Sequence, residues 1–563
     1  MTTFINRLLG LHSDNTNSIA GEVAELSKYW TDRNKAMTRW YEQLRMDDKL
    51  AQKNMESFVS NDTRTTWNMA TYLLQPKALT HTIVSVTGSI IAPDMSDILE
   101  VIKLRIKQLW DNIERQNILA GKQSWFWDMI GLFTATGWYA VTNVTDKTGK
   151  PVVNYWHPAT VFPEFAEGSL GLIRLGRQRM LSAEQAKSQA ISEGWRTDYN
   201  IAGRVSESQL WKLSNNTVLH GVEYNNITVK PMTPTGLTKI PVYVGYAGGL
   251  PDIGVLDDKF RENMGQSILA INEHVYSNFN RLQTFLQQLI RDAANPRVFE
   301  KSTGPKPLIN IEEWYKRGAV FRGGPNDSID VIQMPGIPVE LTSYLFQIRN
   351  QMQRGSFSDL TFGNILQEVS SIVMSQAANA AEQLLYPYWT AIQALITAIS
   401  DEWYQELLID ASKRPSNWPK FDSAKLADTR VVSKYTIKIP GDLNNRINLA
   451  KSLNGRMELP VSTLTEMFLP EISNPKEIEG KLDAERAKLI PEYQKVVLIK
   501  AFDNMVAQAR ELGDTQMAEL ASIVSGMLKQ QLGQVTAEQR MGDVNSDSIV
   551  NARLGDGGQN GAI

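Results

Sequence analysis

The chain has 563 residues, with 58 basic and 61 acidic side chains, a net charge of −3 and no cysteine. The lack of cysteine excludes disulfides and thiolate metal sites, and the small negative charge argues against a dedicated nucleic-acid binder, which needs a basic excess. A hydrophobic content of 42% is typical of a folded protein, and the length requires several packed modules. The sequence has no run of about 18 apolar residues, so we expect no membrane span, and the first residues do not predict a secretory signal.

Residues 1–256 are predicted to form an α+β module. Apolar residues recur at helical spacing over roughly the first 45 residues and again from Asp97 to about Leu119. The runs WYAVTNV (138–144) and PVVNYW (151–156), joined by DKTGK, predict a β-hairpin with Gly149 in its turn. Further strands are expected at 172–177, 217–224 and 241–246.

Residues 257–295 predict one long helix. This stretch contains no proline, and Pro296 follows it. At ~1.5 Å per residue the helix would be roughly 58 Å long. Its apolar stripe follows steps of three and four: Phe260, Met264, Ile268, Ile271, Val275, Phe279, Leu282, Leu286 and Leu289. The rest of its surface is mostly amide and hydroxyl side chains, which suits contact with neighbouring copies or a lining past which something slides.

Residues 296–335 predict a compact insert with strand-like pieces, and residues 336–354 predict a shorter helix that returns. Pro338 lies in the first turn of that helix and Gly355 just beyond its end, the usual asymmetry of helix termini. Together these parts predict a helical hairpin with a cap on its tip.

The segment 355–367 predicts a loop of Gly, Ser, Thr, Phe and Asn without any Lys or Arg. Residues 368–440 predict apolar helices, broken or kinked at Pro387, and then a strand over VVSKYTIKI (431–439). Residues 441–532 are expected to be helical, and the glycine-rich residues 533–563 to be disordered.

No catalytic constellation is evident. The five histidines are far apart in sequence and form no metal-ligand spacing: His12, His81, His157, His220 and His274. Phosphate-binding loops and nucleophile elbows are also missing. The aromatic run SWFWDMIGLF (124–133) lacks the interleaved Lys and Arg of a base-stacking surface, so core or subunit interface is the better interpretation. We therefore expect no enzymatic activity and no cofactor.

The order of these parts resembles the portal proteins (head–tail connectors) of tailed bacteriophages over nearly the whole chain. Four stretches carry the likeness: TGWYAVTNVTDKTGKPVVNYWHPATVFPEF, the hairpin Asp257–Arg354, DLTFGNILQEVSSIVMSQAANAAEQLLYPYW, and PVSTLTEMFLPEISNPKEIEGKLDAERAK. The resemblance implies a predominantly helical α+β fold with wing, stem, clip and crown. It also implies a homo-oligomeric ring, commonly of twelve subunits, at one capsid vertex of the virion.

In that architecture, residues 1–256 form an N-terminal arm and wing, 257–295 and 336–354 the stem, and 296–335 the clip. Residues 355–367 form a tunnel loop, 368–440 further wing helices with a closing strand, 441–532 the crown, and 533–563 a tail. The stem residues would be Met264, Ile271, Val275, Phe279, Leu282 and Leu286. The clip would dock partners through Trp314, Tyr315, Arg317 and Arg322. The tunnel loop would present Ser356, Phe357, Ser358, Asp359, Thr361, Phe362, Asn364 and Gln367 to DNA.

The resemblance further implies assembly in the host cytoplasm with capsid and scaffolding proteins, docking of the large terminase and then of the head–tail adaptor, and passage of double-stranded DNA, without membrane insertion. A loop facing moving DNA should be polar but contribute few phosphate contacts, because each contact tightens binding. Two alternatives stay open. The chain could be another oligomeric structural protein of a phage particle, in the tail or capsid, or a nucleic-acid-processing enzyme with an unrecognised site.

Overall fold

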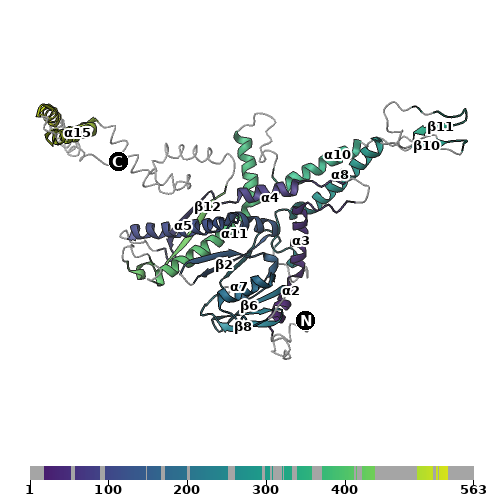
Figure 1. The fold of residues 1–563 in the computed structure, drawn as a ribbon, viewed down its shortest axis with the longest axis horizontal. Coiled ribbons are helices and arrows are strands. Elements are labelled where there is room, and N and C mark those ends of the chain that lie inside the picture. The colour runs from purple at the N-terminus through teal and green to yellow at the C-terminus, as the bar shows by residue number, and fades with distance from the viewer. Residues whose placement is uncertain are drawn as a thin grey trace, which may run out of the picture. The chain divides into compact units, whose positions relative to one another are not determined.

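The structure is a computed structural model that divides into two compact units, Met1–Arg446 (unit 1) and Ile447–Ile563 (unit 2). The residues it describes are 18–51, 57–88, 95–146, 149–166, 171–199, 203–250, 260–294, 298–304, 307, 320, 322–331, 339–357, 371–410, 414, 421–437, 491–511, 515–517 and 519–530. Helices and antiparallel sheets make unit 1 an α+β fold, as predicted (Figure 1).

The described part of unit 1 starts with α2 (Ile19–Tyr29), α3 (Thr31–Arg45) and α4 (Asp62–Leu73). The sequence predicts α2 and α3 as one helix, but the chain breaks at Trp30. The Trp30 ring is buried, and its Nε1 donates to the carbonyl of Pro163 at 2.8 Å. The break between α2 and α3 therefore lies at a residue whose side chain is fixed to the neighbouring sheet.

A five-stranded antiparallel meander in the order β4-β5-β6-β7-β8 forms the lower part of unit 1 in Figure 1. Its strands are β4 (Val161–Phe165), β5 (Leu172–Ser182), β6 (Arg204–Ser214), β7 (Thr217–Tyr224) and β8 (Ile227–Pro234). Helix α2 packs on one face, where a Cβ at Gly221 would lie 2.6 Å from Ile19 Cδ1. Helix α7 (Ala183–Glu193), opened by a Ser182 capping box, joins β5 to β6.

A three-stranded sheet in the order β3-β2-β9 contains β2 (Trp138–Thr145), β3 (Pro151–Tyr155) and β9 (Val242–Tyr246). The predicted hairpin is confirmed, since β2 and β3 pair antiparallel. Helix α6 (Trp125–Thr136) leads into it, with Trp125 and Phe133 buried in the main core. The core interpretation of this aromatic run is therefore confirmed.

The main core lies between α5 (Ser96–Leu119), α11 (Ser371–Ile409), α6 and a two-stranded sheet. That sheet pairs β1 (Ala78–Ser85) with β12 (Thr429–Thr436), which are about 350 residues apart in the chain. Trp110 Nε1 on α5 donates to Ser400 Oγ on α11 at 3.0 Å. Pro387 does not end α11, which continues as one helix through it. Short 3-10 turns lie at η2 (Pro158–Thr160), η3 (Phe260–Glu262), η4 (Ala270–Asn272) and η6 (Ser423–Leu426).

The predicted long helix is shorter than expected. Helix α8 spans Glu273–Ala294, so the prediction of one helix over 257–295 is wrong for the described residues before Glu273. Those residues bond to the body of unit 1: Gln266 N donates to the carbonyl of Ala247, and Ile268 N donates to the carbonyl of Thr134. Gly265 has φ +68°, and a Cβ atom at this position would lie only 2.5 Å from Trp138 Nε1. Tertiary contacts therefore use the backbone groups that a helix would have used.

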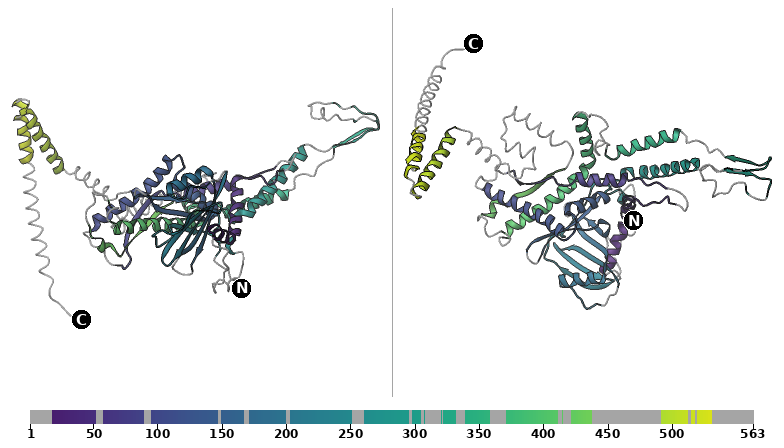
Figure 2. Two further views of the ribbon diagram at one scale, coloured as in Figure 1. Left: turned by 60° about the horizontal axis from the view of Figure 1, so that its bottom comes forward. Right: turned by 45° about the horizontal axis from the view of Figure 1, so that its top comes forward.

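Helix α8 is followed by β10 (Val298–Lys301), which pairs antiparallel with β11 (Ser328–Val331), and α10 (Val339–Arg354) returns beside α8 (Figures 1 and 2). Unit 2 contains α15 (Pro491–Glu511) and further helical residues at 515–517 and 519–530. None of the helices in the described residues combines the length and the apolar character that a bilayer crossing requires. The expected tail at 533–563 lies outside the described residues.

Candidate functional site: the helical hairpin and its base

The two legs of the hairpin, α8 and α10, face each other through apolar side chains. On α8 the inward stripe of Val275, Phe279, Leu282 and Leu286 is buried or half-buried, as the sequence predicts. On α10 the facing side chains are Leu345, Ile348 and Met352, all less than 9% exposed. The legs thus share a continuous apolar interior with the main core of unit 1.

The start of α8 is held by α3. The Glu273 carboxylate, in the first turn of α8, accepts hydrogen bonds from Arg39 Nε at 3.0 Å and Trp40 Nε1 at 2.9 Å. Gln43 Nε2 donates to the Glu273 carbonyl at 3.2 Å. Negative charge at a helix N-terminus is favourable because of the helix dipole. Glu273 therefore stabilises the first turn of α8 and fixes it to α3.

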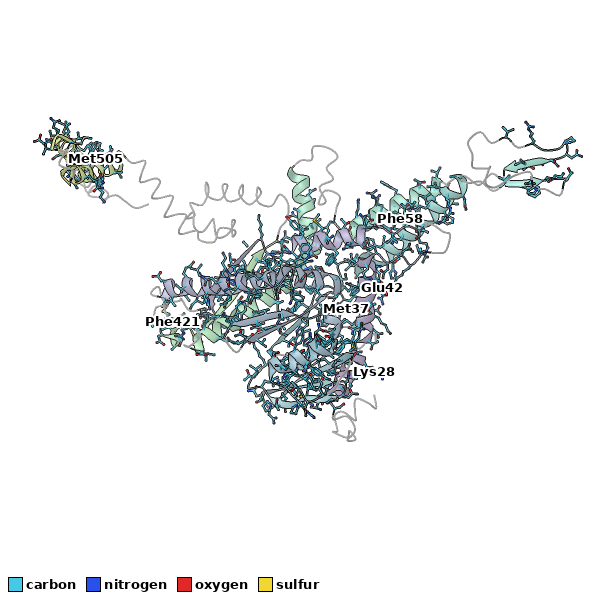
Figure 3. The ribbon with its side chains drawn as sticks, in the orientation of Figure 1. Lys28, Met37, Glu42, Phe58, Phe421 and Met505 are labelled. Carbon is cyan, nitrogen blue, oxygen red and sulfur yellow. The ribbon has the colours of Figure 1, made fainter. Side chains whose placement is uncertain are left out.

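A second attachment comes from residues 57–60, which run along α8. Phe58 N donates to Thr284 Oγ1 at 2.9 Å, and Ser60 N donates to Asn280 Oδ1 at 3.0 Å. The Phe58 ring, labelled in Figure 3, lies edge-on to the Phe279 ring with centroids 6.1 Å apart. Part of the amide-rich surface of α8 is thus used to bind this segment.

The end of α10 is clamped to the beginning of the hairpin. Asn272, only 3% exposed, donates from Nδ2 to the Met352 carbonyl at 2.7 Å. Ser356 Oγ donates to the same carbonyl at 2.8 Å. Gly355 lies so close that a Cβ there would stand 2.3 Å from Asn272 Oδ1. Asn272 therefore joins the residues that enter α8 to the residues that leave α10, and the sequence pattern did not single it out.

Two of the predicted tunnel-loop residues are described, and both lie at this clamp. Phe357 is 2% exposed within the main core, so including it among channel-facing residues was wrong: its ring anchors the chain. Ser356 is half-buried. The other six predicted residues, from Ser358 to Gln367, lie outside the described residues.

The other predicted site residues are those of the stem before α8 and those of the clip. Met264 and Ile271 precede α8: the Met264 carbonyl accepts from Trp138 Nε1 at 2.7 Å, whereas Ile271 is 63% exposed. Their assignment to the helical stripe was wrong because the backbone there follows the body of unit 1. Of the predicted clip residues, Arg322 is exposed, and Trp314, Tyr315 and Arg317 lie outside the described residues.

The outer surfaces of the legs carry large exposed apolar side chains. Phe285 on α8 is 55% exposed, and Phe346 on α10 is 66% exposed. Ile290 on α8 and Tyr344 on α10 are also about half exposed. The sequence-based description of the first predicted helix emphasised amide and hydroxyl side chains and did not single out Phe285, which falls outside the predicted apolar stripe. The outer surface of both legs is therefore partly apolar.

Beyond the legs, the β10–β11 pair is closed by Asp327. Its carboxylate accepts from Thr303 N at 2.9 Å, Thr303 Oγ1 at 2.7 Å and Gly324 N at 2.7 Å. These hydrogen bonds, from the Thr303 backbone first, lower the pKa of Asp327 below its usual value. Asp327 therefore cross-links the two sides of this turn while remaining charged.

His81 and His220 lie in structural surroundings. Burial, followed by the nearby Lys107 charge, lowers the pKa of His81 to about 4, and its Nδ1 lies 2.9 Å from Ser433 Oγ across the β1–β12 pair. Burial, followed by the Lys230 charge, lowers the pKa of His220 to about 3, and its ring stacks on Trp211 with centroids 4.2 Å apart. Both rings therefore stay neutral at physiological pH. The described ranges bring no three His, Asp or Glu side chains together in a way that could hold a metal ion.

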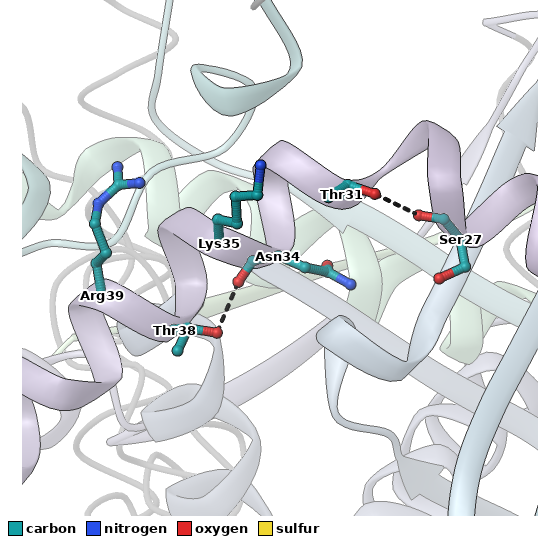
Figure 4. A pocket seen from close by; sticks show the side chains of 6 residues that line it. All are labelled: Ser27, Thr31, Asn34, Lys35, Thr38 and Arg39. Atoms are coloured by element: carbon teal, nitrogen blue, oxygen red, sulfur yellow. Dashed lines mark hydrogen bonds between the residues drawn. The ribbon is translucent and has the colours of Figure 1, made fainter.

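Two hollows lie near α3. The larger, about 580 Å³, runs along the polar side of α2 and α3 and is lined by Ser27, Thr31, Asn34, Lys35, Thr38 and Arg39 (Figure 4). Thr31 and Thr38 there donate their hydroxyls to helix carbonyls. The second, about 330 Å³, lies between α3, residues 57–63 and α8, and mixes acidic and basic side chains. Neither combines a nucleophile with a positioned base, so the hairpin is the better candidate for the functional feature.

No protein-family model matches the chain, and no curated protein matches it in sequence. Among solved structures, the chain is similar to one in the neck of a native gene transfer agent (GTA) particle computed with C12 symmetry. The identity is 12%, with 73% of this chain and 89% of that chain covered and a TM-score of 0.37. A neck chain of an empty GTA particle computed with C6 symmetry gives 12% identity, coverage of 73% and 90%, and a TM-score of 0.40.

A chain from the virion of a native GTA particle gives 11% identity, coverage of 78% of this chain and 98% of that chain, and a TM-score of 0.40. All three TM-scores are below 0.5.

Proposed function

We propose that this chain is the subunit of a portal ring, a structural component of a phage-like particle that conducts double-stranded DNA. The order of its described parts supports the proposal. An α+β body leads into α8, a two-stranded pair follows, α10 returns beside α8, and α11 continues into the core. The ring would lie at one capsid vertex of the virion, dock the terminase and then the tail adaptor, and have no enzymatic activity of its own.

The observation that carries the proposal is the pair of opposed surfaces on the hairpin. Its inner side chains are buried, and its base is held by Glu273 and Asn272, yet Phe285 and Phe346 remain exposed on the outside. In an isolated chain, the exposure of these two phenylalanine side chains to water is unfavourable, and nothing in the hairpin requires it. Neighbouring hairpins arranged around an axis would cover these side chains. In a ring with closed cyclic symmetry, every copy would make the same contacts.

Assembly is tested on the full chain by mass photometry and negative-stain electron microscopy. We expect closed rings with an axial hole and a mass near a whole multiple of 63.2 kDa, about twelve copies in the usual case. Phe346→Glu should reduce the ring fraction, whereas Gln347→Glu, an exposed neighbour on α10, should not. Monomers or dimers under all conditions would contradict the proposal. Filaments or shells would favour a tail or capsid protein instead.

The channel role depends on residues 355–367, which contain no Lys or Arg. A loop without basic side chains would let DNA pass because few phosphate contacts would be made and few counterions released. Replacing Asp359, Thr361 and Asn364 by lysine should raise affinity for duplex DNA and slow its passage. Normal packaging and release in this variant would contradict the channel role, even where rings form.

The clip role is proposed for residues 296–335 and rests on the aromatic pair Trp314 and Tyr315. Aromatic side chains often carry much of the binding energy at protein interfaces. Replacing either by alanine should weaken docking of the terminase or adaptor to preformed rings in a pull-down assay. Rings that bind both partners normally would exclude this role.

A further inference from the structure

The five-stranded meander carries polar side chains on the face that α2 does not cover. The register pairs Arg177 on β5 with Gln209 on β6, and the same row continues through Val222 on β7 to Lys230 on β8. Directly opposed residues of an antiparallel sheet point to the same face. Gly221, which precedes Val222, points to the other face and lies against α2. Arg177 and Lys230 therefore lie at the two ends of one row on the face opposite α2.

Arg177 is a buried cation without an anionic partner. Its side chain is 8% exposed, and its guanidinium lies over the Trp156 ring, with Cζ 3.9 Å from the ring centroid. Within the described residues Arg177 donates no hydrogen bond, and its Nε is fully buried. Burial, followed by the charge of Arg179, lowers the pKa of Arg177 to about 9. Buried charges are costly unless they are paired, and a cation–π contact offsets only part of that cost.

The carboxylates of the neighbouring strands are already used. The fully buried Glu207 forms an ion pair with Arg179, and its Oε1 accepts from Gln209 Nε2 at 2.8 Å. Glu223 points to the other face of the sheet, where it accepts from a backbone N–H of α2 at 2.8 Å. No described carboxylate therefore remains to contact Arg177.

A second buried donor without a partner lies on the same face. Lys230 Nζ is 2.8 Å from His220 Nδ1. An ammonium group can only donate, so Nδ1 accepts and the proton of the neutral His220 ring lies on Nε2. That Nε2 is fully buried, and none of the described residues accepts its hydrogen. The His220 ring stacks on Trp211, whose centroid lies 5.5 Å from that of Trp156, the ring beneath Arg177.

The charge of Lys230 is not fully compensated either. Burial lowers the pKa of Lys230, and the exposed Glu193 on α7 offsets only part of this effect. The face thus combines two cations and two unpartnered N–H donors beside a pair of tryptophan rings. An ordered water molecule could accept from one donor, but it would not compensate a charge. An anion would do both.

We propose that this face of the meander binds a small free oxyanion, a carboxylate or a phosphate, at Arg177. The Nε–H and one terminal N–H of a guanidinium form a fork that matches two oxygen atoms of such an anion. Because Nε is buried, only a small anion can reach it, and the backbone of a nucleic acid cannot. The site lies within unit 1, so the inference is independent of ring formation.

Isothermal titration of the full chain with acetate and with inorganic phosphate, at constant ionic strength, tests this inference. We expect saturable binding of one anion per chain for at least one probe. Arg177→Lys keeps the charge but loses the fork, so the dissociation constant should rise at least tenfold. Arg204→Gln is the matched control, because it removes an exposed arginine at the start of β6, and it should leave binding unchanged. Absence of saturable binding, or equal dissociation constants in all three proteins, would overturn the inference.

Thermal unfolding with a second variant gives an independent readout. Arg177→Met removes the buried charge and retains an apolar contact with Trp156. At about ten times the dissociation constant, the anion should raise the melting temperature of the unmodified chain by about 2–4 °C, and the rise should level off. The melting temperature of Arg177→Met should not show this saturable rise. A continuous rise of the same size in both proteins would be a general effect of the salt and would overturn the inference.

Discussion

Replacing Gly355 by alanine should loosen the base of the helical hairpin. The backbone of Gly355 does not adopt a positive φ, so alanine is compatible with its conformation. The obstacle is the new methyl group, which would stand 2.3 Å from Asn272 Oδ1 and 2.7 Å from Asn272 Cγ. Asn272 would have to move although it is buried and hydrogen-bonded to the Met352 carbonyl.

The expected cost combines two effects. Forcing a methyl group into a packed site costs about 1–3 kcal/mol, and leaving the buried Asn272 amide without its partner costs about 1–3 kcal/mol. Because both effects come from one displacement, a total of about 2–4 kcal/mol is expected rather than their full sum. This corresponds to amide exchange about 30- to 1,000-fold faster at the base of the hairpin.

Hydrogen exchange measured by mass spectrometry on the full chain resolves this change, with peptides covering 268–280 and 345–357. Gly304→Ala is the control, because the nearest atom to a Cβ there is Ser302 Oγ at 3.9 Å. In an Asn272→Ala background, Gly355→Ala should cost less than about 1 kcal/mol, since the obstructing side chain is gone. The reasoning fails if Gly355→Ala has the same effect in both backgrounds, or no effect.

Three further predictions concern contacts within unit 1. Glu273→Gln should cost about 1 kcal/mol in urea unfolding, and less at high salt, because Arg39 is partly exposed and its ion pair is screened. The pKa of His81 is about 4 in the folded chain, below the ordinary 6.5, so the unfolded chain binds the proton first as pH falls. Stability should therefore decline by up to about 3 kcal/mol between pH 6.5 and pH 4, and His81→Gln should lack this part of the pH dependence; equal slopes would exclude it. Tyr243→Phe should lower the thermal stability by about 1–2 kcal/mol, because the Glu402 carboxylate loses the hydroxyl that lies 2.5 Å away. An unchanged melting temperature would show that this hydrogen bond contributes little.

Elements with local causes were predictable from the residues alone. The β2–β3 hairpin follows from two alternating runs joined by a short turn with Gly149, whose φ is +78°. Helix α5 and strand β7 likewise match their apolar periodicity, because each needs only neighbouring residues to define its buried side. The interior of the hairpin belongs to the same class, since the stripe from Val275 to Leu286 lies on one face of α8.

Features with distant causes were not predictable in this way. Strand β1 was missed because its partner β12 is about 350 residues away, and nothing near β1 indicates that pairing. The apolar stripe continues smoothly before Glu273, yet the chain there is not an α-helix, because its backbone groups bond to Ala247 and Thr134 instead. Phe357 is a second example of a distant cause. The composition of the segment 355–367 suited a solvated loop, but the Phe357 ring is buried in the core.

The residues by themselves therefore determined which segments are amphipathic, where turns interrupt them, and that a helical hairpin follows an α+β module. Only the tertiary structure decided where α8 begins, how Asn272 and Glu273 hold its base, and which apolar side chains stay exposed on the hairpin. The physical reason is that periodicity records which side of an element is apolar. What covers that side depends on segments far away in the chain, or on another molecule.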